Sequence, residues 1–154
     1  MKQGIYLSFF NLFFPRAAAV AGFSNIDPLF VLAVAALESA FGKKAPHFNF
    51  FGLKASPSTL NLFYAKTKEY DPQRKLMVSK IDSFRSYAGF EESCIDFCRL
   101  VKHKYPQCVG VFDSSVCKLL QANPKRKYAT DPAYSEKLES LYFIFKGIKE
   151  RGKV

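Results

Sequence analysis

Hydrophobic positions recur near the helical period at the start of the chain. Within residues 5–22, Phe9, Leu12, Phe13 and Ala17 follow this spacing and predict a first helix whose apolar side packs on the rest of the domain.

A second helix is marked by its ends as well as by its composition. Asp27 suits the N-cap, Pro28 suits the first turn, and Gly42 lies where a left-handed C-terminal residue is expected. Between them, residues 29–41 are apolar or small except for one charge, Glu38. The pattern places Glu38 in the last helical turn, where a side chain can reach a cleft.

The middle of the chain changes to strand-like patterning. Residues 43–58 predict an ordered loop, residues 60–70 and 76–84 predict two strands, and Asp-Pro-Gln-Arg at 71–74 predicts the turn of a β-hairpin. Alternate residues of a strand share a face. One face of the first strand carries Phe63, Ala65, Thr67 and Glu69, and the other carries Leu62, Tyr64, Lys66 and Lys68.

Helical patterning returns after the hairpin, at residues 90–104, 114–122 and 132–151. Asp131 before Pro132 repeats the cap signal of the second helix, so a structural role is expected for Asp131. No internal repeat or linker interrupts the chain. We therefore expect one domain over residues 1–154, mainly α with a small β-hairpin lobe.

Composition excludes a disordered chain and indicates an anionic partner. Hydrophobic residues make up 49% of the 154 residues, with 17 Phe, and the formal net charge is +10. Nucleic acid, acidic lipid and anionic cell-wall polymers all satisfy such a charge. A nucleic-acid binder explains the charge but no motif, because basic segments such as residues 125–127 are scattered among acids.

The N-terminus superficially resembles a signal peptide. Lys2 precedes the apolar residues 5–14 and an Ala-rich stretch, but Pro15 and Arg16 interrupt the pattern where cleavage should follow. No apolar run of 18 residues is evident, so no membrane insertion is expected.

Four cysteines leave three alternatives open. Cys94, Cys98, Cys108 and Cys117 do not match paired zinc-ligand spacing, although Cys94 and Cys98 could join His103. A Cys108–Cys117 disulfide is the second alternative. Free, buried thiols are the third and the most favoured, and no metal or cofactor is expected.

Glu38 is the candidate acid on physical grounds alone. Burial disfavours the ionised form, so a carboxyl at the edge of an apolar helix can keep its proton near neutral pH and donate it. The structural alternative places Glu38 at a solvent boundary or in an ion pair with an Arg such as Arg85.

Four segments, in order, resemble glycoside hydrolase family 73, the peptidoglycan-cleaving β-N-acetylglucosaminidases. The resemblance covers roughly residues 9–148. The segments are residues 35–42 (Ala-Ala-Leu-Glu-Ser-Ala-Phe-Gly), 49–55 (Asn-Phe-Phe-Gly-Leu-Lys-Ala), 84–87 (Phe-Arg-Ser-Tyr) and 128–134 (Tyr-Ala-Thr-Asp-Pro-Ala-Tyr).

The resemblance implies a lysozyme-like fold and assigns roles by position. Glu38 matches the family's general acid, and Tyr128 matches a tyrosine that supports catalysis or the N-acetyl group of the sugar. The family's second acid lies on a hairpin, often in a Thr-x-Glu-Tyr context, which residues 67–70 reproduce with Glu69. A glycosidase needs such a second group to activate water or stabilise the oxocarbenium ion.

Other residues of the matched segments are expected to shape the floor of a glycan groove beside Glu38. Asn49, Phe51 and Gly52 would supply hydrogen bonding, packing and close backbone approach, and Arg85 would pair with a carboxylate or bind glycan. Tyr87 and Tyr134 are expected in the core.

The resemblance implies a monomeric enzyme that cleaves the β-1,4 bond between N-acetylglucosamine and N-acetylmuramic acid in peptidoglycan. Such an enzyme acts in the periplasm or cell wall and binds a peptidoglycan glycan strand rather than nucleic acid. The alternative is a non-catalytic cell-wall-binding or structural module of an envelope assembly.

Overall fold

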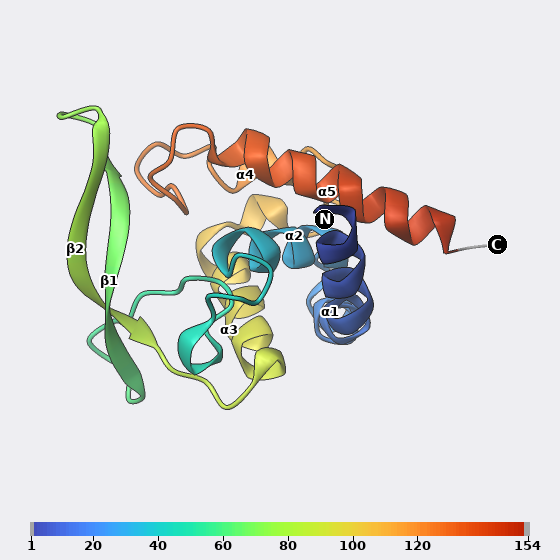
Figure 1. The fold of residues 1–154 in the computed structure, drawn as a ribbon, viewed down its shortest axis with the longest axis horizontal. Coiled ribbons are helices and arrows are strands. Elements are labelled where there is room, and N and C mark those ends of the chain that lie inside the picture. Colours follow the sequence, from blue (N-terminus) through green and yellow to red (C-terminus); the bar gives the residue numbers. More distant parts are fainter. Residues whose placement is uncertain (1, 153–154) are drawn as a thin grey trace.

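Helices form one body and a long hairpin stands at its side in the computed structural model, which describes residues 2–152 (Figure 1). The architecture is mainly helical α+β, as the sequence predicts. The elements are α1 (Lys2–Ser24), α2 (Pro28–Glu38), β1 (Leu62–Asp71), β2 (Leu76–Arg85), α3 (Phe90–Lys104), α4 (Val116–Leu119) and α5 (Tyr134–Arg151), with 3-10 turns at Pro46–Phe48 and Pro106–Cys108.

Helix α2 is the centre of the body, and residues 29–36 are all buried. Asp27 is its N-cap, since its Oδ1 accepts a hydrogen bond from Leu29 N at 2.9 Å. The helix ends earlier than the position of Gly42 suggests. Ser39 is the C-cap, its hydroxyl donates to Ala35 O at 2.6 Å, and the left-handed backbone begins at Ala40 rather than at the glycine.

The hairpin has the predicted faces. Its strands pair antiparallel over ten residues each, and the face of β1 that carries Phe63 and Glu69 is the less exposed one. The segment after Gly52 joins the base of the hairpin, because Lys54 bridges Phe84 and Ala55 N donates to Ser83 O at 2.9 Å. The hairpin is thereby tied to the loop that follows α2.

Two helices in the C-terminal third differ from the sequence prediction. Helix α4 covers only Val116–Leu119, and α5 begins at Tyr134 with Ala133 as its N-cap. Asp131 is therefore not the N-cap. It accepts a hydrogen bond from Ala133 N at 2.9 Å and pairs with Lys137, so it stabilises the turn that leads into α5.

Helix α1 corrects the expectation that no stretch is long and apolar enough to cross a membrane. Its 23 residues pass that test by length and composition, because Pro15 does not end the helix and its only charges are Lys2 and Arg16. Core helices of soluble proteins and signal sequences pass the same test. Phe9, Phe13 and Ala17 pack on the body as predicted, whereas Leu12, expected on the same side, is exposed.

The cysteines Cys94, Cys98, Cys108 and Cys117 are free and buried, so the Cys108–Cys117 disulfide is not formed. Within residues 2–152, no group of three or more potential ligands could hold a metal ion.

Candidate active site

Glu38 is the last residue of the buried helix α2 and is partly exposed to solvent. Burial of its carboxyl raises the pKa from 4.5 to about 7, although a contact with Tyr134 acts in the opposite direction. The group therefore holds a proton for part of the time near neutral pH. Arg85, named above as an ion-pair partner for Glu38, pairs with Asp96 instead.

Gly52 lies directly against the Glu38 carboxyl. Its backbone has a φ of +67°, which favours glycine, and a Cβ added there would lie 2.9 Å from Glu38 Oε2. Only a residue without a side chain leaves this carboxyl where it is. The expected close backbone approach is present, and it is directed at the candidate acid itself.

We expect Gly52→Ala to displace Glu38 and to reduce kcat by about 100-fold, because a shift of about 1 Å in a reacting group can have that effect. The left-handed backbone should also lower the free energy of unfolding by about 1–2 kcal/mol. Turnover and thermal denaturation measure the two effects. Gly22→Ala is the matched control, since no atom lies within 4 Å of its added Cβ. Wild-type turnover in Gly52→Ala would contradict the need for this close approach.

Asn49 holds the loop that carries Gly52. Its buried amide donates to Leu53 O and to Arg85 O, both at 2.9 Å, and accepts from Leu53 N at 3.1 Å. Phe51 is also fully buried, and its ring stacks on Phe97 with centroids 4.4 Å apart. The structure therefore places Asn49 and Phe51 as buried supports of the loop beside Glu38, one through hydrogen bonds and the other through packing.

Tyr128 lies beside the same loop and donates a hydrogen bond to the carbonyl oxygen of Phe51. Burial and the nearby Glu38 carboxyl raise the pKa of Tyr128 well above its ordinary value, so its hydroxyl stays a donor. The hydrogen-bond partners that hold this segment were not predicted. The Gln121 side-chain amide donates to Ala129 O and accepts from Ala129 N. Thr130 Oγ1 accepts a hydrogen bond from Tyr70 N of the hairpin at 3.0 Å.

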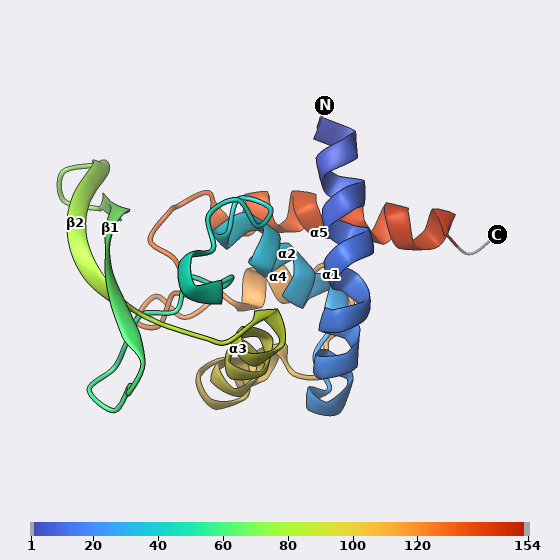
Figure 2. The same cartoon turned by 60° about the horizontal axis from the view of Figure 1, so that its bottom comes forward.

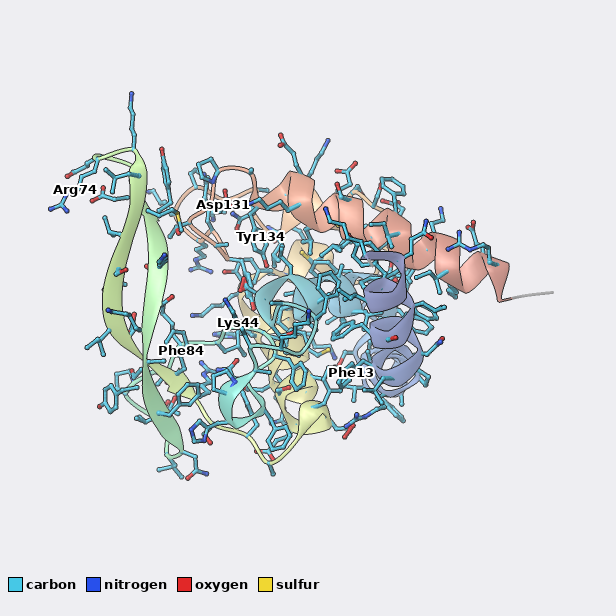
Figure 3. The ribbon with its side chains drawn as sticks, viewed as in Figure 1. Phe13, Lys44, Arg74, Phe84, Asp131 and Tyr134 are labelled. Carbon is cyan, nitrogen blue, oxygen red and sulfur yellow. The ribbon has the colours of Figure 1, made fainter. Side chains whose placement is uncertain are left out.

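Tyr134 is a core residue, as predicted, and its hydroxyl lies close to the candidate acid. It lies at the end of α5 that faces the hairpin (Figure 3), and the residue is only 3% exposed. Its ring centroid is 6.0 Å from that of Tyr128. The hydroxyl approaches Glu38, yet it is the one fully buried side-chain polar atom in residues 2–152 without a partner at normal hydrogen-bond geometry. Tyr134 thus contacts the candidate acid, and Tyr128 lies near it.

Glu69 lies on the inner face of the hairpin within a cluster of four charges. Lys54 and Lys80 both pair with its carboxylate, Lys80 at 3.2 Å, and both lysines also pair with Asp82 at 3.1 and 3.6 Å. Partial burial alone would raise the pKa of Glu69, but the two lysines outweigh it and hold the pKa below its ordinary value. Glu69 is therefore ionised at a pH at which Glu38 still holds its proton for part of the time.

Gly52 and Lys54 link the two carboxyls. Gly52 touches Glu38, and Lys54, two residues later, pairs with Glu69. Two carboxyl groups with pKa values displaced in opposite directions are the arrangement that acid–base division of labour requires.

Arg85 supports the base of the hairpin instead of facing Glu38. Its guanidinium pairs with Asp96 at 2.9 Å and donates to Lys54 O at 3.0 Å, while the Tyr87 hydroxyl donates to the same Asp96. A hollow of about 410 Å³ lies beside Arg85 and Asp96. Of the two roles expected for Arg85, pairing with a carboxylate or binding glycan, the structure shows a pairing, with Asp96.

A comparison with known protein families matches the part of the chain that contains these site residues. The sequence model of the glucosaminidase family, described as mannosyl-glycoprotein endo-beta-N-acetylglucosaminidase, matches residues 15–145. The chain belongs to this family, glycoside hydrolase family 73. Glu38, Gly52, Glu69 and Tyr128 all lie within the part that matches the glucosaminidase family.

A sequence relative and a solved structure both support this family assignment. The peptidoglycan hydrolase FlgJ of Vibrio cholerae is 30% identical over 140 residues, which are 85% of this chain and 41% of that protein. The chain thus spans about two-fifths of the length of this relative. A peptidoglycan hydrolase mutant from Sphingomonas sp. A1 has a TM-score of 0.80 at 27% identity and covers 94% of this chain and 99% of its own.

A second solved structure supports the fold assignment. The C-terminally truncated glycoside hydrolase domain of Salmonella typhimurium FlgJ has a TM-score of 0.72 at 26% identity, covering 92% of this chain and 98% of that chain. The glucosaminidase fold of this chain is therefore the lysozyme-like one that its sequence predicts.

Proposed function

We propose that this glucosaminidase-family protein hydrolyses peptidoglycan at the β-1,4 bond between N-acetylglucosamine and N-acetylmuramic acid. Relatives that match most of the chain are named peptidoglycan hydrolases. The observation that carries the proposal is the pair of carboxyls, since burial raises the pKa of Glu38 to about 7 while two lysines hold the pKa of Glu69 below its ordinary value.

In this mechanism Glu38 protonates the oxygen that leaves with the muramic acid residue as the bond to C1 of N-acetylglucosamine breaks. Glu38 is partly exposed, so a substrate can reach its carboxyl. The same carboxyl is buried enough to raise its pKa to about 7, so it still has a proton to donate near neutral pH. Water then attacks C1 and gives up a proton to one of the two carboxylates, and the resulting sugar ends in a reducing N-acetylglucosamine.

The positive charge at C1 needs a second group. Glu69 as a carboxylate can stabilise that charge or activate the water. The alternative is the acetamide of the substrate itself, with the Tyr128 hydroxyl assisting. Both alternatives keep Glu38 as the acid.

The bond assignment has a direct test. Purified protein should solubilise peptidoglycan, and the products should carry reducing N-acetylglucosamine ends. Reducing muramic acid ends would overturn the bond assignment. Binding to the wall without any product would instead identify a non-catalytic cell-wall-binding module of an envelope assembly.

The site of action follows from the substrate, so the protein would work in the periplasm or cell wall. The formal charge of +10 would hold it on an anionic wall. Salt should weaken that attraction, because charges on the surface are screened within about 10 Å at 0.1 M ionic strength.

Tyr134 is a positioning residue in this scheme, and we expect Tyr134→Phe to move the alkaline limb of the pH profile. The Tyr134 hydroxyl favours the ionised form of Glu38 and so lowers its pKa. Removing the hydroxyl should shift the limb of kcat/KM to higher pH from its wild-type position near 7. Tyr142→Phe is the matched control, because the Tyr142 hydroxyl donates to Asp27 at the other end of α2. An unchanged alkaline limb in Tyr134→Phe would show that the Tyr134 hydroxyl does not act on the pKa of Glu38.

A further inference from the structure

Helix α1 presents an outer face without charge. A helix on the surface of a soluble protein normally places charged and polar residues on its outer side. Here Leu12 is 59% exposed and Phe23 is 93% exposed. The exposed positions spaced three or four residues apart along this face, which we call the α1 outer face, are Gly4, Ser8, Leu12, Pro15, Ala19 and Phe23.

Apolar hollows flank the N-terminal half of the same helix. One, of about 1060 Å³, lies between α1 and α5 and is lined by Leu7, Phe10 and Phe143 among others. The other, of about 530 Å³, lies on the opposite flank against Phe41. The N-terminal turns of α1 project beyond the helical body (Figure 2), and only 17% of the apolar window of α1 is buried. The fold therefore leaves much of this apolar helix uncovered.

The charges beside the hollows have one sign. Lys149 and Arg151 line the larger hollow and Lys43 lines the smaller, and no Asp or Glu among residues 2–152 lines either of them. Glu91 is a carboxylate that contacts α1, and Arg16 neutralises it in an ion pair. The α1 outer face is thus an uncharged, largely apolar surface with a cationic rim.

We propose that the α1 outer face and its two hollows dock on an anionic lipid membrane, with α1 lying along the surface. Apolar side chains would enter the boundary of the acyl chains while Lys43, Lys149 and Arg151 meet the headgroups. A second copy of the chain fits less well, since a symmetric contact would bring like charges together in a protein of formal charge +10. A glycan strand would leave the apolar surface uncovered.

This docking leaves the carboxyl pair accessible. The hairpin that carries Glu69 and the helix α1 lie on opposite sides of the helical body in both views (Figures 1 and 2). A molecule held on a membrane through α1 can therefore present its hairpin to polymer beyond the headgroups. The proposal concerns a different surface from the hydrolysis and stands independently of it.

Sedimentation with vesicles tests the proposal on the full chain. We expect binding to vesicles of phosphatidylglycerol and phosphatidylcholine in equal parts, and at least tenfold weaker binding to phosphatidylcholine alone. Leu12→Gln combined with Phe23→Gln should weaken binding to the anionic vesicles at least tenfold. Lys149→Gln should weaken it about fivefold.

Matched variants separate a specific face from general stickiness. Leu60→Gln removes an apolar side chain that is 95% exposed at the base of the hairpin, and Lys125→Gln removes an exposed cation outside the rim. Both should bind like the wild type, and circular dichroism should show all variants folded. Absence of binding to the anionic vesicles, or equal loss in Leu60→Gln, would overturn the proposal. A dimer in analytical ultracentrifugation that Leu12→Gln and Phe23→Gln dissociate would assign the face to a second copy instead.

Discussion

Glu38→Gln should reduce peptidoglycan hydrolysis by about a thousandfold or more while leaving the fold intact. The amide has nearly the same shape but has no proton to donate to the leaving oxygen, and general acid catalysis contributes about 10²–10⁴-fold. Release of reducing ends from purified peptidoglycan measures the loss. Glu136→Gln, an exposed change in the first turn of α5, is the matched control and should retain full activity. Substantial turnover in Glu38→Gln would refute the assignment of the acid.

The same variant should be more stable than the wild type at alkaline pH. Because the folded pKa of Glu38 is raised from 4.5 to about 7, the folded protein binds this proton more tightly than the unfolded chain does. The stability that this proton contributes is complete below about pH 4.5 and is lost as pH rises through 7. Gln cannot ionise, so the variant should gain about 1–3 kcal/mol at pH 8 and nothing at pH 4. Thermal denaturation at the two pH values measures the difference.

Local sequence patterns were sufficient to predict the elements that carry the carboxyls. The Asp27-Pro28 cap predicts where α2 begins, and the single charge in its apolar run identifies Glu38. The alternation along β1 predicts the inner face that Glu69 occupies. These features depend on the periods of helix and strand, which a sequence displays directly.

The contacts that complete the site could not be predicted in the same way. Tyr134 approaches Glu38 only because α5 packs on α2, which is a long-range contact. The pairing of Arg85 with Asp96 likewise depends on how the hairpin meets α3. Such contacts are set by tertiary packing, and no local period encodes them.

The end of α2 illustrates a further limit. Gly42 signals a left-handed residue, but Ala40 and Phe41 already have positive φ angles. Residues other than glycine rarely adopt this conformation, so composition alone misplaces the helix end by several residues. The ordered loop after α2 imposes it, since Lys44 N donates to Ser39 O at 2.8 Å. This early end is what leaves Glu38 as the last residue of α2 and partly exposed.

Glu69→Gln should reduce kcat by about 100-fold or more if Glu69 is the second group of the mechanism. Lys54 and Lys80 keep this carboxylate ionised, so it carries the negative charge that a developing positive charge at C1 requires. Gln keeps the size of the side chain and removes the charge. Turnover of soluble glycan fragments at saturating concentration measures kcat, and KM should change little because the effect belongs to the transition state.

Asp82→Asn separates chemistry from the stability of the hairpin, because Asp82 pairs with the same two lysines as Glu69. If the cluster only holds the hairpin in place, both variants should lose similar activity and similar thermal stability. If Glu69 acts on the substrate, Asp82→Asn should keep kcat within a few-fold of the wild type while Glu69→Gln does not. Full activity in Glu69→Gln would transfer the role to the acetamide of the substrate, and Tyr128→Phe should then cause the larger loss. The two carboxylates share their cations but not their expected effect on kcat, so the comparison tests the second group without disturbing Glu38.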